Sequence, residues 1–123
     1  MIKIKLKKNL PKTWLIDIDG TIVEHNSHIK SKNKLLKGVK KFWNRIPKKD
    51  KIIILTARDK KYKKSTIEFL RKNKINYDLI IFDLNVGERI LINDKKPDNT
   101  KTSVAINLKR DSGLDNLSFE YYK

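Results

Sequence analysis

The sequence predicts an α/β fold, a three-layer domain built around a central, mainly parallel sheet, and three observations indicate it. Short, nearly continuous apolar runs recur along the chain, as expected for strands that are covered on both faces. Segments with apolar residues at helical spacing lie between several of these runs. The resulting order of strand, helix, strand, helix and strand is typical of α/β proteins. The length of 123 residues suits one domain, residues 1–123.

Several segments have the pattern of strands. Residues 2–7 alternate apolar residues with lysine, which predicts a strand with one face in water, at an edge of a sheet. The nearly continuous apolar runs are residues 13–18, 52–55, 79–82, 90–92 and 104–108. Only residues 83–89 separate the third run from the fourth, whereas a helical crossover between parallel strands needs roughly a dozen residues. We therefore expect either a short, irregular strand or an abbreviated sheet at this point. Residues 113–123 show no clear periodicity.

Two segments have the pattern of helices that bury one face. Apolar residues recur at helical spacing over residues 35–46, and Pro47 follows as a stop signal. A second helix is predicted over residues 60–73, with Asp59 as its N-cap. The residues expected to face inward from this helix are Tyr62, Thr66, Phe69 and Leu70.

The formal net charge of +16 is unevenly distributed. Residues 1–64 contain 20 Lys or Arg against 5 Asp or Glu, whereas residues 65–123 contain 10 against 9. A basic half of this kind attracts phosphates or nucleic acid. The alternative is the codon bias of an AT-rich genome, which also favours lysine. Whatever the origin of the lysine excess, the positive electrostatic field of the protein favours an anionic substrate.

The composition argues against several classes of protein. The chain has no cysteine, so it has neither a disulfide scaffold nor a thiolate metal site. No apolar run approaches the length that spans a membrane, and the first residues lack the apolar core of a signal peptide. We therefore expect a soluble cytoplasmic protein with no membrane partner.

Two aspartates end the first of the buried strands. In WLIDIDGTIVE, residues 14–24, Asp17 and Asp19 are two positions apart, so in a strand both carboxylates point the same way. Like charges this close raise the pKa of one carboxyl group unless a cation lies between them. Mg²⁺ is the small, oxygen-seeking cation that suits such a pair. Gly20 then permits a close approach of the backbone.

Two more predicted strands end at the same edge of the sheet, where open α/β sheets bind their ligands. ILTAR, residues 54–58, ends just before a helix, so the Thr56 hydroxyl and the backbone N–H groups form a phosphate cradle. Arg58 adds a bidentate clamp for an oxyanion. RILIND, residues 89–94, ends in a third carboxylate and is followed by two cations, so this end supplies Asp94, Lys95 and Lys96.

These stretches carry a resemblance to a known family. DIDGT after one apolar strand, ILTAR at the end of a second and LINDKKPD at the end of a later one are similar to three of the four motifs of the haloacid dehalogenase (HAD) superfamily of phosphotransferases. The resemblance covers about residues 13–110 and implies a Rossmann-like, HAD-like core. The first motif is specific, and the order and spacing of the other two reinforce it.

The resemblance implies a role for each matched residue. Asp17 would attack phosphorus and form an aspartyl-phosphate, and Asp19 would act as the general acid and later activate water. Mg²⁺ would be held by the side chains of Asp17 and Asp94 and by the backbone carbonyl of Asp19. Thr56 would hold the phosphoryl oxygens. The residues implied to bind substrate are Gly20, Thr21, Ala57, Arg58 and Arg89. Each match also has a structural alternative, namely a turn at Asp19–Gly20, a helix cap at Thr56, and a surface ion pair between Asp94 and Lys95.

The chain departs from the family pattern at two points. The third motif is a lysine that bridges the nucleophile and the phosphate, and no lysine lies between residues 75 and 94. Arg89, Lys95 and Lys96 are the candidates to replace it. We favour Lys95 as the catalytic cation, because it directly follows the metal-binding carboxylate. Asn93 stands where the family often has a second acid, and it is expected to orient a metal-bound water. These changes either lower the activity or mark a divergent subgroup.

The resemblance implies a capless enzyme, because residues 22–51, where many HAD enzymes insert a cap domain, hold only a short flap and one helix. The motifs resemble those of short phosphatases of sugar-phosphate and capsular polysaccharide metabolism. The implied function is Mg²⁺-dependent hydrolysis of a phosphate monoester, with a small sugar phosphate favoured. The alternatives are a phosphatase of nucleic-acid 3′ ends and a catalytically weakened binding module.

Members of the family without a cap act on large substrates, or a neighbouring subunit completes their active site. A homo-oligomer is therefore one expectation for this chain. The flap contains His25 and His28. These histidines either contact the leaving group of the substrate or are bystanders in an exposed loop.

Overall fold

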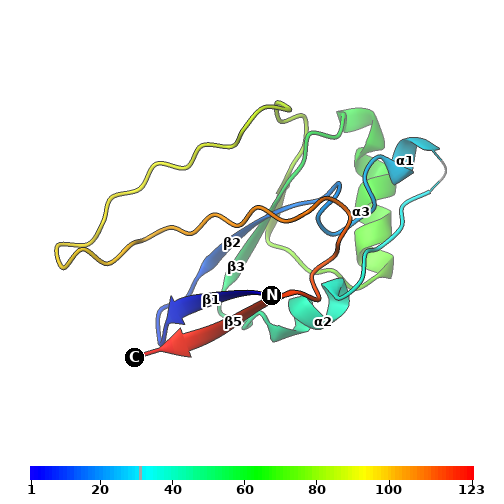
Figure 1. Cartoon of the computed structure of the whole chain (residues 1–123). Helices are drawn as coiled ribbons and strands as arrows, with labels where there is room; N and C mark the ends of the chain where they lie inside the picture. Colours follow the sequence, from blue (N-terminus) through cyan, green and yellow to red (C-terminus); the bar gives the residue numbers. More distant parts are fainter. Residues whose placement is uncertain (31) are drawn as a thin grey trace.

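The structure, a computed structural model, describes residues 1–30 and 32–123; residue 31 and the side chain of Lys30 lie outside the description. The elements follow the order β1, β2, α1, α2, β3, the 3₁₀ turn η1, α3, β4 and β5 (Figure 1). The paired strands are parallel and fall into two sheets. The predicted α/β class with parallel strands is therefore confirmed.

The three-stranded sheet carries most of the predicted site. It contains β2 (Thr13–Asp17), β3 (Lys51–Leu55) and β4 (Leu79–Ile81) in the order β2-β3-β4. The three apolar runs that predicted these strands are thus confirmed. β2 lies at an edge of this sheet, because in the described part of the chain only β3 pairs with it. Asp17 therefore ends an edge strand and not a central one.

The second sheet pairs the two ends of the chain. β1 (Ile2–Lys7) runs parallel to β5 (Leu117–Tyr122), with Ile4 beside Phe119. The predicted strand over residues 2–7 is confirmed, and it is an edge strand. β5 was not predicted, because only Leu117 and Phe119 of its six residues are buried and no regular alternation continues after them.

The helices differ from the predictions mainly at their starts. α2 (Val39–Arg45) begins at Val39 and not at Leu35, which instead forms an antiparallel bridge with Val23. Gly38, just before α2, has a φ of 75°, a conformation that glycine adopts without strain.

The second predicted helix is present as η1 (Lys60–Tyr62) followed by α3 (Lys63–Lys72). Its predicted cap is confirmed, because the Asp59 carboxylate accepts a hydrogen bond from the Lys61 backbone N–H. The flap contains the short helix α1 (Ser27–Lys30). In the described residues, no helix has both the length and the apolar character needed to cross a membrane.

The core lies between the two helices α2 and α3 and one face of the three-stranded sheet. Trp14 of β2 packs edge-on against Phe42 of α2, with ring centroids 5.8 Å apart, and lies 5.1 Å from the ring of Phe119. Each tryptophan also has a partner for its indole N–H, Asp50 for Trp14 and the Asn76 carbonyl for Trp43. α3 contributes the fully buried Leu70 to the same cluster. Both helices therefore cover the same face of the sheet.

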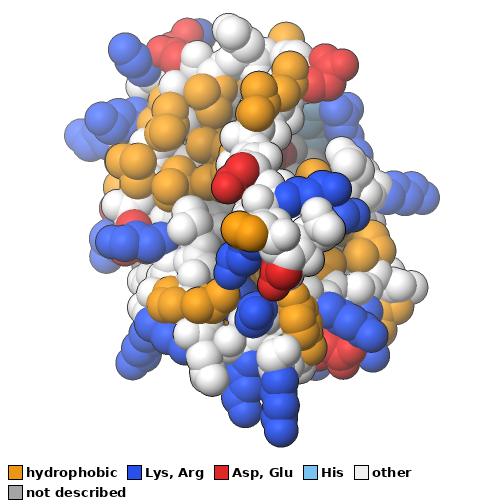
Figure 2. All heavy atoms as spheres, turned by 90° about the vertical axis from the view of Figure 1, so that its left-hand side faces the viewer, with side chains coloured by type: hydrophobic (Ala, Val, Ile, Leu, Met, Phe, Trp, Pro, Cys, Tyr) orange, Lys and Arg blue, Asp and Glu red, His pale blue; other side chains and the backbone are white. Residues whose placement is uncertain are grey.

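The opposite face of this sheet is open, which corrects the prediction of a three-layer arrangement. Leu15, Leu79 and Ile81 point to that face and are exposed. Figure 2 shows hydrophobic side chains gathered on the side from which a long segment projects, with Lys and Arg around them. Helices α2 and α3, together with Phe119 of the second sheet, cover one face of the three-stranded sheet, and the other face is open.

Residues 85–109, which we call the arm, extend from the body of the molecule and return to it (Figure 1). The predicted strands at residues 90–92 and 104–108 lie in the arm and are not formed. Ile90 and Ile92 are exposed, so each forgoes the roughly 1.5–3 kcal/mol that burial of such a side chain contributes. The short connection before residue 90 is thus accompanied by an abbreviated sheet, one of the two outcomes expected.

We predict that Ile54→Ala lowers the free energy of unfolding by about 2–5 kcal/mol, because Ile54 is fully buried in β3. The control Leu15→Ala, on the open face of β2, is expected to lower it by less than about 1 kcal/mol. Urea unfolding followed by tryptophan fluorescence measures both. Equal losses would contradict the assignment of a buried and an open face.

Candidate functional site

Asp17 lies at the carboxyl end of β2 and is partly exposed to solvent. Its Oδ1 accepts a hydrogen bond from Nη1 of Arg89 at 2.8 Å, and its Oδ2 accepts one from the Thr21 hydroxyl at 3.0 Å. The Asp17–Arg89 ion pair is about one third exposed on both sides, with relative exposures of 33% and 37%. A pair with this exposure stabilises a fold by only about 0–1 kcal/mol. Asp17 is thus accessible and held by a weak contact.

Asp19 is held more firmly. Nε and Nη2 of Arg58 donate to its two carboxylate oxygens at 3.0 and 2.9 Å, which is a bidentate pair. Arg58 is only 4% exposed, and its Nη1 donates to the Thr66 hydroxyl on α3 at 2.8 Å. The guanidinium that was predicted to clamp a substrate oxyanion therefore already binds a carboxylate of the chain. This buried pair joins the end of β2 to α3.

Thr56 is buried at the end of β3 and is held by its neighbours. Its backbone N–H donates to the Ile81 carbonyl, and its own carbonyl accepts a bond from the Leu84 N–H. Its hydroxyl oxygen accepts a hydrogen bond from the Arg58 N–H at 3.0 Å. The hydroxyl therefore acts within the loop before η1 and α3 and does not cap a helix, because Asp59 is the N-cap of η1. Ala57, next to it, is exposed.

The turn after Asp19 has the tight geometry that the sequence predicted. Gly20 has a φ of 84°, where a side chain is strained, and its N–H donates to the Val23 carbonyl at 2.7 Å. Its carbonyl accepts a bond from the Asp111 N–H at 2.9 Å, and a Cβ at this position would lie 3.1 Å from Cγ of Arg110. The return of the chain from the arm is thus packed against this turn.

His28 is a site residue that the sequence interpretation did not place. Its side chain is 6% exposed, and its Nδ1 lies 3.6 Å from Oδ1 of Asp19. The ring packs edge-on against Tyr62, with centroids 4.5 Å apart. Burial, and then the charge of Arg58, lower the pKa of His28, while Asp19 acts in the opposite direction. The expected exposure is therefore wrong for His28, and no pattern in the sequence signals this burial.

Asp94, Lys95 and Lys96 lie elsewhere, on the arm. The Asp94 carbonyl accepts a bond from the Thr102 hydroxyl across the arm, and the Lys96 N–H donates to the Thr100 carbonyl at 2.9 Å near its tip. Figure 1 shows this tip directed away from the body of the molecule. The structure therefore does not bring Asp94 or Lys95 to Asp17 and Asp19. Of the three cations considered for the third motif, Arg89 is the one in contact with Asp17.

The predicted Mg²⁺ centre does not fit the residues that the structure brings together. The described residues contain no group of three or more His, Cys, Asp or Glu that would hold a metal ion. Two carboxylates meet at the end of β2, and each already has a guanidinium as its counter-charge. The arrangement compensates the two negative charges with Arg58 and Arg89, and the third carboxylate is on the arm.

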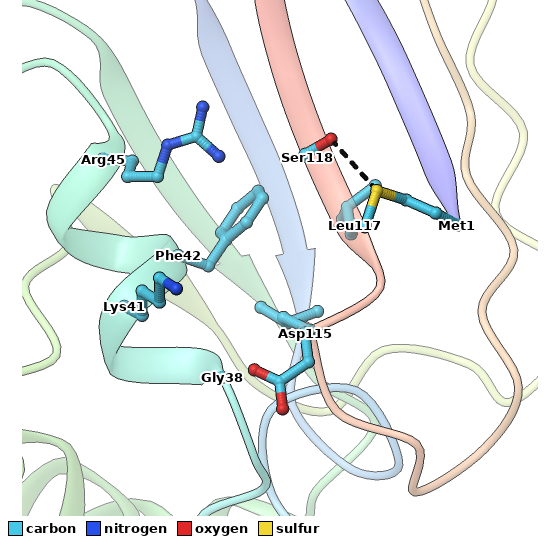
Figure 3. A pocket seen from close by; sticks show the side chains of 9 residues that line it. Met1, Gly38, Lys41, Phe42, Arg45, Asp115, Leu117 and Ser118 are labelled. Carbon is cyan, nitrogen blue, oxygen red and sulfur yellow. Dashed lines mark hydrogen bonds between the residues drawn. The ribbon is translucent and has the colours of Figure 1, made fainter.

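A small hollow of about 210 Å³ lies on another part of the surface, between α2 and β5 (Figure 3). Lys41, Phe42 and Arg45 line it from α2, and Leu117 and Ser118 line it from β5. None of the predicted site residues borders it. It arises where the second sheet packs against α2.

We predict that Arg58→Met lowers the free energy of unfolding by roughly 3–5 kcal/mol, because it leaves the Asp19 carboxylate without its partner in a mostly buried place. The matched change Arg89→Met removes the other guanidinium and is expected to cost less than about 1 kcal/mol. Urea unfolding gives both values. A small loss for Arg58→Met would show that the buried pair does not hold α3 to β2.

Comparison with models of protein families, with curated proteins and with solved structures gives no significant match to this chain. The interpretation of the site therefore depends on its own residues and contacts.

Proposed function

We propose that the chain is a phosphatase with a HAD-like core that hydrolyses a phosphate monoester through Asp17. The observation that carries this proposal is the position of Asp17, which is accessible at the carboxyl end of a parallel strand and contacts a guanidinium at 2.8 Å. A phosphoryl group that reaches Asp17 would meet both a nucleophile and a cation that balances its charge. Asp19, fixed beside it by Arg58, supplies a second carboxylate.

The reaction would proceed in two half-reactions. An oxygen of Asp17 attacks phosphorus, the bond from phosphorus to the leaving oxygen breaks, and that oxygen takes up a proton. The family resemblance assigns this proton to Asp19, which can carry it only when its bidentate contact with Arg58 opens, because both carboxylate oxygens accept hydrogen bonds there. Water then attacks the phosphorus of the aspartyl-phosphate, releasing phosphate and restoring the carboxylate. An Asp19 held as an acceptor by Arg58 suits the second half, because a carboxylate there can take a proton from the water. The dependence on Mg²⁺ stays a prediction of the resemblance.

A small sugar phosphate is the favoured substrate. The net charge of +16 attracts anions. The flap contains only the short α1 and forms no enclosing cap, so the preference for a small sugar phosphate rests on the resemblance of the motifs and not on the shape of the site. A second function, an anion-binding module without turnover, has one observation in its favour: both carboxylates already bind arginines.

We predict that the protein releases inorganic phosphate from members of a panel of phosphorylated sugars in a buffer with Mg²⁺, and that Asp17→Asn abolishes this release. The variant keeps the shape of the side chain and removes its charge and nucleophilicity. Phosphate release measures the activity, and the midpoint of thermal unfolding verifies that the variant is folded. A 3′-phosphorylated oligonucleotide in the same panel tests the nucleic-acid alternative.

Equal rates for the wild type and Asp17→Asn on every substrate would reject the proposed phosphatase. In that case, binding of phosphate with no turnover by the wild type would support the anion-binding module.

A further inference from the structure

The two-stranded sheet has an open side along β1. In the described residues β1 pairs only with β5. The N–H groups of Ile2 and Lys8 donate to the carbonyls of Asn116 and Tyr122, so the even-numbered residues of β1 direct their backbone groups toward β5. These directions alternate along a parallel strand. The odd-numbered residues of β1 therefore direct their N–H and C=O groups to the side that no strand covers.

All three odd-numbered residues are lysines, and we call Lys3, Lys5 and Lys7 the lysine row. Side chains two positions apart share one face of a strand, so three positive charges follow the same face of β1. Lys3 and Lys5 are exposed. Nζ of Lys3 lies 3.9 Å from Oε2 of Glu120, and both side chains are about half exposed, which is typical of a weak surface pair. The charge of the row is thus largely uncompensated.

The row already acts on a carboxylate of the arm. The pKa of Asp98 is lowered, first by hydrogen bonds from Thr100 and then also by the charges of Lys7 and Lys96. An acidic side chain that comes near β1 is therefore stabilised in its charged form.

The other face of β1 is apolar. Ile2 is 39% exposed, and Ile4 and Leu6 are half-buried against the core. A strand added beside β1 would place alternate side chains on these two faces. Its complement to the pattern of β1 is therefore a segment in which acidic and apolar residues alternate, since opposite charges across neighbouring strands stabilise a pair.

We propose that the free side of β1 binds an extended acidic segment of a partner protein, which adds to the two-stranded sheet as a third strand. Its acidic side chains lie beside the lysine row, and its apolar side chains lie beside Ile2 and Ile4. In this mode of recognition the backbone hydrogen bonds supply affinity, and alternate side chains supply specificity. The inference does not rest on the proposed phosphatase.

The charges favour an acidic protein over two other occupants. Two copies of β1 side by side would place their lysine rows against each other, and like charges in that arrangement are destabilising. Each copy also carries a net charge of +16. Nucleic acid is attracted by the same lysines, but a phosphate backbone has no N–H donors for the unpaired carbonyls of an edge strand.

Three blocked peptides with the length of β1 serve as probes. One alternates glutamate with valine, the second has the same residues in two blocks, and the third alternates lysine with valine. We predict that the full chain binds the alternating acidic peptide at least about tenfold more tightly than the block peptide, which has the same charge and composition. The lysine peptide is expected not to bind. Fluorescence anisotropy of the labelled peptides at physiological salt measures the affinities.

Lys3→Gln/Lys5→Gln is expected to weaken binding of the alternating acidic peptide about tenfold, because two of the three charges of the row are lost. The matched control is Lys64→Gln/Lys72→Gln, which removes two exposed lysines of α3 and the same net charge. It is expected to change the affinity by less than about twofold, because distant charges are screened by salt. The midpoint of thermal unfolding verifies that both variants are folded.

Hydrogen exchange of single amides distinguishes an added strand from the attraction of charges alone. When the alternating acidic peptide is bound, the N–H groups of Lys3 and Lys5 are expected to become protected. Those of Ile4 and Leu6 face β5 and are expected to be protected with and without the peptide.

Several results would overturn the proposal. Absence of binding, equal binding of the alternating and block peptides, or binding without new protection of Lys3 and Lys5 would exclude an added strand. Protection of these amides before any peptide is added would show that the chain itself or a second copy covers β1. A single-stranded oligonucleotide that binds more tightly than the peptide and displaces it would make the occupant a nucleic acid. Phosphate release is a separate assay, so the proposed function is tested independently.

Discussion

Compensation of two negative charges at the end of β2 is the constraint on which the rest of the structure depends. Asp17 and Asp19 are close in sequence and lie at the end of β2 and just after it, so a counter-charge near each relieves their repulsion. Arg58 supplies one and thereby ties α3 to the turn after β2 through Thr66. Arg89 supplies the other through a weak, partly exposed ion pair at the base of the arm. Two carboxylates thus contact, through their arginines, a helix and the base of a long extended segment.

The elements that could be predicted are those whose signal is local. The isoleucine-rich runs of β2, β3 and β4 and the capped start of η1 at Asp59 were all identified, because apolar period and capping chemistry are properties of neighbouring residues. The arm was not predicted. An apolar run indicates that a segment tends to be buried, but it does not identify the segment against which it packs. The late start of α2 depends on Leu35 pairing with Val23, a tertiary contact.

In the candidate site, the positions of the residues could be predicted, whereas their contacts could not. Asp17, Asp19, Thr56 and Arg58 converge because parallel strands end at one edge, which the sequence order implies. The partner of each group could not be predicted. Arg58 was expected to face a substrate and instead binds Asp19, and Asp94 follows the arm away from the site. The burial of His28 depends on Tyr62, far along the chain.

The parallel pairing of β1 with β5 has a consequence for biosynthesis. β1 has no partner until β5 has been translated, and at about 5–20 residues per second this takes several seconds. During that interval β1 is a lone strand that other nascent chains could capture. Lys3, Lys5 and Lys7 alternate with its apolar residues, and like charges of this kind discourage such capture. In the folded chain these lysines lie on the solvent-facing side of the two-stranded sheet.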